Sequence, residues 1–175
     1  MRKTTWACLA VLVASSLAVA QKQRGPSTAE ERARYVAIAQ KLERAPLDPE
    51  LRPEREWALR WLIEVPDINV SVCTAPLGEF MKKKYKYSPE VVTQLTFASG
   101  QFIIEHPEQA KDATAQYVAG VEGALRAYQS ILKVKPEAKS RELDELFQKQ
   151  TQGTLAEFVR DAAGKGCGGG ASSHS

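Results

Sequence analysis

The sequence predicts an all-α fold, a single-domain bundle of about six helices with one short extended segment. Apolar residues recur at helical spacing in six segments, and prolines and glycines separate these segments. Most of the connections are short, which favours antiparallel neighbours in one bundle. The expected helices cover residues 26–46, 47–66, 88–106, 107–136, 140–150 and 154–164.

The first two expected helices have clear starts and ends. Ser27 and Thr28 each have a glutamate three residues on, Glu30 and Glu31, which is the spacing of a capping box at the start of the first helix. Prolines mark the end of both helices and the first turn of the second. In the second helix, Trp57 and Trp61 lie one turn apart. We expect this pair to form core or to line an apolar surface groove.

Between the second and third helices, residues 67–73 have the period of a strand. Ile68, Val70 and Val72 alternate with polar or small residues. Because a lone strand has no hydrogen-bonding partner in a helical chain, we expect a well-packed extended crossing. The alternatives are a short two-stranded pairing or an edge that is open to a partner.

The third and fourth helices are the most apolar. Ser88 is expected to cap the third helix, with Pro89 at its first helical position. Gly100 is expected to weaken this helix by about 1 kcal/mol relative to alanine. In the long fourth helix, Gly120 and Gly123 either let a neighbouring helix approach closely or mark a bend.

The last two helices are short and amphipathic. Thr154 and Glu157 repeat the capping-box spacing, and Gly164 is expected to end the final helix. Residues 165–175 are rich in glycine and serine and have no large apolar side chain, so we expect a flexible tail.

One helical segment matches part of a known repeat. Residues 122–138 resemble the second helix of a tetratricopeptide repeat at Ala124, Tyr128 and Pro136. The preceding helix lacks that family's pattern, and no second copy occurs at its spacing. We interpret the match as ordinary helical patterning.

The N-terminal segment has the layout of a secretory signal peptide. Two basic residues precede an uncharged, mostly apolar run from Trp6 to Ala20, which ends in small residues. We expect residues 1–20 to be removed, leaving a helical domain over residues 21–164 with no transmembrane span; an uncleaved anchor is the alternative. The mature protein of a bacterium would then lie in the periplasm or outside the cell.

Charge and cysteine content limit the partners. Removing the two N-terminal cations would lower the formal net charge from +3 to +1, so no nucleic acid partner is indicated. In an oxidising compartment Cys73 and Cys167 could form a disulfide; otherwise Cys73 is an ordinary buried thiol. These cysteines, His106 and His174 do not have the spacing of a zinc site, and we expect no metal or cofactor.

Catalytic motifs are scarce. The sequence contains no nucleophile elbow, glycine-rich phosphate loop, zinc-protease motif or calcium loop. One enzymatic alternative is a cell-wall-directed hydrolase, in which Glu64, close to Asp67 and the tryptophan pair, would act as an acid with a raised pKa. We expect a binding protein rather than an enzyme.

The most distinctive polar stretch is MKKKYKYSPE, residues 81–90. At the end of a short helix its lysines would complement the helix dipole, while the tyrosine rings pack inward and keep their hydroxyls in water. As a functional surface it would contact an anionic component of the cell envelope or a protein partner. A structural or chaperone-like envelope subunit is a further alternative. The residues of this lysine run are Lys82, Lys83, Lys84, Tyr85, Lys86 and Tyr87.

Overall fold

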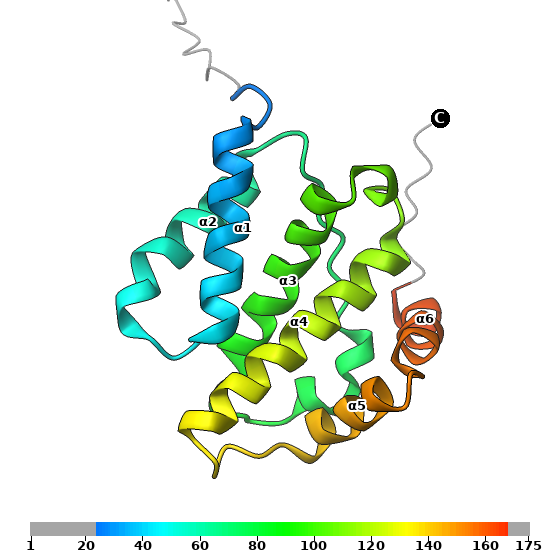
Figure 1. The fold of residues 1–175 in the computed structure, drawn as a ribbon. Coiled ribbons are helices and arrows are strands. Elements are labelled where there is room, and N and C mark those ends of the chain that lie inside the picture. The colour runs from blue at the N-terminus through cyan, green and yellow to red at the C-terminus, as the bar shows by residue number, and fades with distance from the viewer. Residues whose placement is uncertain (1–23, 168–175) are drawn as a thin grey trace, which may run out of the picture.

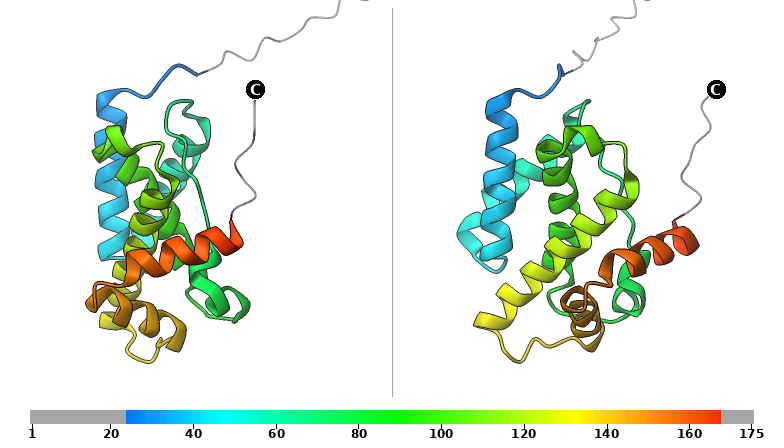
Figure 2. Two further views of the ribbon diagram at one scale, coloured as in Figure 1. Left: turned by 90° about the vertical axis from the view of Figure 1, so that its right-hand side faces the viewer. Right: turned by 45° about the vertical axis from the view of Figure 1, so that its right-hand side comes forward.

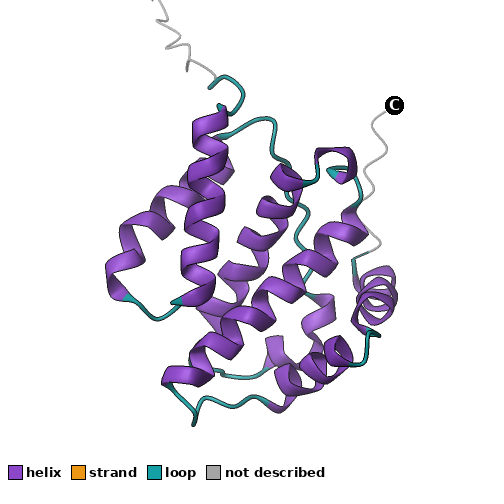
Figure 3. Ribbon diagram, viewed as in Figure 1, coloured by secondary structure: helices purple, strands orange, loops and turns teal. Residues whose placement is uncertain are grey.

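The computed structural model describes residues 24–167 (Figure 1). Within this range the chain folds into six α-helices and three short 3₁₀ helices without a strand (Figure 3), which confirms the all-α class. The expected signal peptide lies outside the described residues. The α-helices are α1 (Ala29–Arg44), α2 (Arg52–Glu64), α3 (Ser88–Glu105), α4 (Ala113–Val134), α5 (Arg141–Thr151) and α6 (Leu155–Gly166). The 3₁₀ helices are η1 (Pro49–Leu51), η2 (Ala75–Lys82) and η3 (Pro107–Gln109).

The helices α3 and α4 form the central pair of the bundle (Figure 1). On one side α1 packs against both of them, and α2 packs on α1. On the other side α5, α6 and η2 pack against one another, with α5 and α6 also contacting α4 (Figure 2). Each side has its own cluster of buried apolar side chains, and α3 contributes to both.

Small residues let α3 and α4 approach closely. A Cβ atom at Gly120 would lie 2.6 Å from Ser99 Oγ, and one at Gly123 would overlap the Cβ of Ala98. The two glycines therefore serve the close approach rather than a bend. Gly100 in α3 has a similar role, because the ring of Tyr35 from α1 packs directly against it.

The local signals for helix starts were confirmed at α1 but were wrong at α6 and α3. Thr28 Oγ1 accepts a hydrogen bond from Glu31 N at 3.2 Å, and the Glu31 carboxylate accepts one from Thr28 N at 3.0 Å, so the capping box is confirmed. The second capping box is wrong, because Thr154 Oγ1 donates instead to the carbonyl of Lys149. Ser88 is the first residue of α3 and not its cap.

The fourth helix starts later than expected. Residues 107–109 form η3, and α4 begins after Asp112, whose carboxylate accepts a hydrogen bond from Ala115 N at 3.0 Å. A side-chain cap of this kind satisfies a backbone N–H that has no partner within the helix.

Residues 67–73 link α2 to η2 without forming a strand. Ile68 and Cys73 are buried, whereas Val72 is half exposed. The backbone N–H of Ser71 donates to Gln116 Oε1 of α4 at 2.8 Å. Packing and this hydrogen bond hold the segment as a crossing, and the alternative two-stranded pairing is absent from the described residues.

The final helix continues past the predicted stop. It includes Gly164 and extends to Gly166, so the tail expected from residue 165 is wrong for residues 165–167. A disulfide joins Cys167 to Cys73, with 6.0 Å between their Cα atoms. Gly166 also approaches Ala75 of η2 so closely that an added Cβ would lie 2.5 Å from the alanine methyl group. The rest of the expected tail lies outside the described residues.

Candidate functional site

The lysine run lies on the segment that leaves η2, and Tyr85 holds it in place. The Tyr85 hydroxyl donates a hydrogen bond to the carbonyl of Ala138 at 2.8 Å, and its ring packs against Phe80 and Tyr128 at centroid distances of 5.4 and 6.4 Å. Burial, with a smaller effect of the neighbouring phenols, raises the pKa of Tyr85. The expectation that this hydroxyl stays in water is therefore wrong. The exposed residues of the run are Lys82, Lys83, Lys84 and Lys86.

The lysines differ in their partners. Lys82 Nζ lies 2.7 Å from Glu79 Oε1, and this hydrogen bond lowers the pKa of the glutamate. Lys86 Nζ lies 5.3 Å from the centre of the half-buried Tyr87 ring, a cation–π contact. Among the described residues, Lys83, Lys84 and Lys86 take part in no ion pair.

Folding brings further cations next to the lysine run. The Tyr85–Ala138 hydrogen bond joins segments that are 53 residues apart. The loop after α1 lines two hollows beside these segments. It lines the first together with Val134 and Lys135, and the second together with Lys86 and Tyr87. We call residues 44–48, 82–87 and 134–139 the basal end, the lower end of the molecule in Figure 1.

The basal end is strongly basic. Its acidic residues are Asp48 and Glu137, and the Asp48 carboxylate accepts a hydrogen bond from Glu50 N at 2.9 Å. Glu142 lies at the edge of the basal end. Hydrogen bonds to its own backbone and to Ser140 lower its pKa, with smaller contributions from the charges of Arg141 and Lys83. The basic residues are Arg44, Lys82, Lys83, Lys84, Lys86, Lys135 and Lys139.

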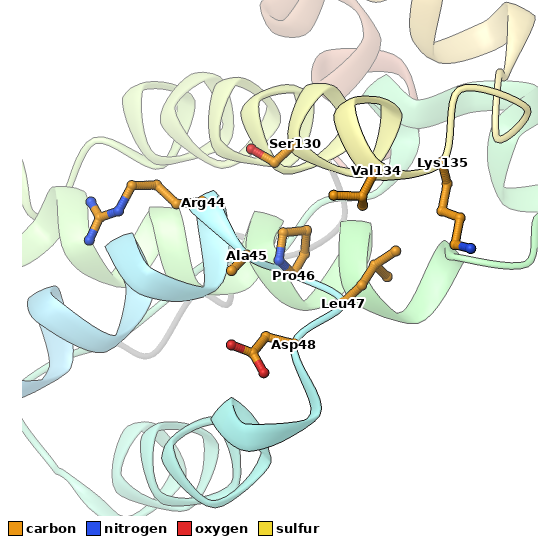
Figure 4. A pocket seen from close by; sticks show the side chains of 8 residues that line it. All are labelled: Arg44, Ala45, Pro46, Leu47, Asp48, Ser130, Val134 and Lys135. Carbon is orange, nitrogen blue, oxygen red and sulfur yellow. The ribbon is translucent and has the colours of Figure 1, made fainter.

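A hollow of about 390 Å³ opens at the basal end, where α1 and α4 finish (Figure 4). Pro46, Leu47 and Val134 form an apolar surface inside it. Arg44 and Lys135 lie on opposite sides of this surface. An apolar hollow between two cations suits a ligand that has both an apolar part and a negative charge.

A second hollow adjoins the first across the loop after α1. It has a volume of about 320 Å³ and contains Lys86, Arg55 and Glu90. The Arg55 guanidinium donates a hydrogen bond to the Pro46 carbonyl at 2.9 Å and so stiffens the wall between the two hollows. Because Lys86 lines this hollow together with Arg52 and Arg55, the lysine run lies next to the cations in the first turns of α2.

The tryptophan pair belongs mainly to the core. Trp61 is only 3% exposed and its ring lies 4.8 Å from that of Tyr35. Trp57 stacks on Trp61 at 5.9 Å, and the Arg34 guanidinium lies 3.8 Å above its ring. Both indoles also border a hollow of about 240 Å³, together with Glu64. Trp61 therefore forms core, as one expectation had it. The hollow is not the expected apolar groove, because its other lining residues are all charged: Arg24, Glu31, Arg60 and Glu64.

The structure does not join Glu64 and Asp67 in one site. The Asp67 carboxylate accepts hydrogen bonds from Ser27 N, Ser27 Oγ and Arg32 Nη2, each at 2.8 Å, and does not line the hollow of Glu64. Partial burial raises the pKa of Asp67, but these hydrogen bonds outweigh it and lower the pKa overall. An acid catalyst needs a raised pKa, so Asp67 does not suit that role. Its hydrogen bonds to Ser27 and Arg32 instead connect the start of α1 to the chain just after α2.

A further hollow, of about 430 Å³, was not found from the sequence. It brings together Phe102 of α3, His106 just after α3, Glu122 of α4 and Arg160 of α6. The His106 ring packs on Phe102 at 4.8 Å. These residues lie far apart along the chain and form no motif, so only the packing of three helices could reveal the hollow. It is open and of mixed charge, and nothing in it selects a ligand class.

Two negative findings concern the described residues, 24–167. They contain no group of three or more histidine, cysteine, aspartate or glutamate side chains arranged to hold a metal ion. None of their helices has the length and apolar character that crossing a bilayer requires.

Comparison with protein families, with curated proteins and with solved structures found no match for this chain.

Proposed function

We propose that this protein is a binding module that contacts an anionic phospholipid surface in the cell envelope through its basal end. One observation carries the proposal. Folding gathers exposed cations from three separate segments at one end of the bundle, around a hollow that is lined by apolar side chains. The lysine run and the hollow together suit a bilayer surface, which has anionic headgroups above an apolar interior.

The energetics favour weak, reversible adsorption. Each lysine or arginine near an anionic bilayer contributes about 1 kcal/mol, and salt screens this attraction over about 8–10 Å. Val134 and Met81, which are 62% and 42% exposed, add apolar contact at the same end. Because Tyr85 already fixes the backbone of the lysine run, binding has less backbone entropy to lose.

Export supports the same proposal. The Cys73–Cys167 disulfide is typical of an oxidising compartment such as the periplasm or the medium. The N-terminal segment has the layout of a secretory signal. We propose that the folded domain works outside the cytoplasm.

Vesicle binding tests the proposal. The variant Lys83→Ala/Lys84→Ala/Lys86→Ala removes three exposed cations that have no ion pair among the described residues. Since each contributes about 1 kcal/mol, we expect partitioning onto phosphatidylglycerol vesicles at low salt to fall by about 100-fold. Flotation of wild type and variant measures this directly, with phosphatidylcholine vesicles as the uncharged surface.

A matched control removes the same charge elsewhere. Lys111→Ala/Arg160→Ala/Lys165→Ala changes three exposed cations away from the basal end and should leave vesicle binding close to that of the wild type. Equal losses in both variants would mean that net charge alone matters. Absence of binding at low salt, or full binding by the lysine variant, would contradict the proposal.

A further inference from the structure

We infer that the hollow between the ends of α1 and α4 holds the acyl chain of an amphiphile with an anionic headgroup. The inference deepens the proposed function and rests on it for the source of the ligand at a membrane.

The lining of the hollow selects an apolar chain. Pro46 is buried and Leu47 is half-buried, and their side chains face Val134 across the hollow (Figure 4). Val134 is the last residue of α4 and is 62% exposed, although an apolar concave surface lies beside it. A chain inserted here would cover the exposed parts of Leu47 and Val134 and lie against the buried Pro46.

The charges at the hollow select an anionic headgroup. Arg44 and Lys135 lie on its opposite sides, both are exposed, and neither forms an ion pair or a side-chain hydrogen bond within residues 24–167. Both lie at the C-terminal ends of α1 and α4, where a cation complements the helix dipole. Asp48, the one acid at the hollow, is hydrogen-bonded to the backbone of η1.

The size of the hollow limits the occupant. Its volume of about 390 Å³ lies at the small end of the usual range for ligand pockets, about 300–1,000 Å³. A partner helix is about 10–12 Å across and needs a long groove for side chains spaced over two turns. One acyl chain fits the hollow better than a helix or a pair of chains.

Calorimetric titration with dodecanoate below its critical micelle concentration tests the inference on the full mature chain. We expect one chain to bind per protein, and Val134→Asp to weaken the affinity at least 10-fold by placing a charge against the chain. Ile63→Asp is the matched control, because Ile63 is a β-branched residue on α2 that is 76% exposed and lies outside the hollow. It should bind as the wild type does.

The headgroup is tested separately. Arg44→Ala/Lys135→Ala should weaken dodecanoate binding while leaving the affinity for dodecanol, which has no charge, unchanged. No dodecanoate binding, binding of many chains, or equal affinity of wild type and Val134→Asp would overturn the inference.

The two proposals fail in different ways. The lysine variant with changes at residues 83, 84 and 86 should lose vesicle binding yet keep dodecanoate, because none of these residues lines the hollow. Dodecanoate binding without vesicle binding would support the binding site in the hollow but contradict the membrane as the source of its ligand. Vesicle binding without dodecanoate binding would contradict the acyl-chain site and support the membrane contact.

Discussion

At the residue scale, the position of Gly123 shows how closely α3 and α4 pack. Alanine would favour the helix by about 1 kcal/mol, but its methyl group would overlap that of Ala98, and overpacking costs about 1–3 kcal/mol. We expect Gly123→Ala to lower the free energy of unfolding by up to about 2 kcal/mol. Gly164 of α6 has open space around it, so Gly164→Ala should raise stability by about 0.5–1 kcal/mol. Urea unfolding of both variants measures the two changes in the free energy of unfolding. Equal changes would contradict the close approach of α3 and α4 at Gly123.

Buried phenols make the protein sensitive to alkali. Burial raises the pKa of Tyr128 to about 12, while a hydrogen bond from Ser140 N opposes the shift and Asp144 adds to it. A raised pKa means that the folded state holds its proton longer than the unfolded state. The contribution of Tyr128 to the free energy of unfolding is therefore fully present below about pH 10 and is lost as the pH rises towards 12.

Tyr128→Phe tests this pH dependence. The variant loses the titrating group, so its free energy of unfolding should fall less steeply between pH 10 and pH 12 than that of the wild type. Denaturant unfolding at several pH values gives the two slopes. Identical slopes would show that Tyr128 does not titrate in this window.

Single residues were predictable only when their partners were close in sequence. The capping box of Thr28 and Glu31 was found because both members lie within one turn. Tyr85 was misjudged because its partner, the Ala138 carbonyl, is 53 residues away. Asp67 was misjudged for the same reason, since Ser27 is 40 residues distant.

At the element scale, the disulfide fixes the end of α6. It joins residues that are 94 apart in sequence, and closing so long a loop restricts the unfolded chain strongly. We expect Cys73→Ala/Cys167→Ala to lower the free energy of unfolding by about 2–5 kcal/mol. Denaturant unfolding of this variant, and of the wild type with and without reductant, gives the value. Unfolding midpoints that do not respond to reductant would show that the bond does not form in solution.

Helix identity was predicted from periodicity, and helix ends were not. All six α-helices lie within or near their expected ranges, because each has an apolar face that must be buried. The start of α4 was missed because Pro107 opens a separate 3₁₀ turn and Asp112 supplies the cap. The end of α6 was missed because the disulfide and the contact with Ala75 extend order past Gly164.

At the scale of the whole molecule, the basal end exists only in the folded chain. The sequence identified one of its three segments, the lysine run, and offered no reason to join it to residues 44–48 or 134–139. Turns at the ends of α1 and α4 bring these segments together, and the hollow of Figure 4 lies between two of them. Charge that is scattered along the sequence becomes a surface through helix packing alone.

The most direct measurement of the central claim is hydrogen exchange of the protein with phosphatidylglycerol vesicles at low salt. If the basal end contacts the membrane, backbone amides in residues 44–48, 82–87 and 134–139 exchange more slowly with these vesicles than with phosphatidylcholine vesicles. Slowed exchange confined to another region, such as α2 around Trp57 and Trp61, or no change anywhere, would contradict the claim.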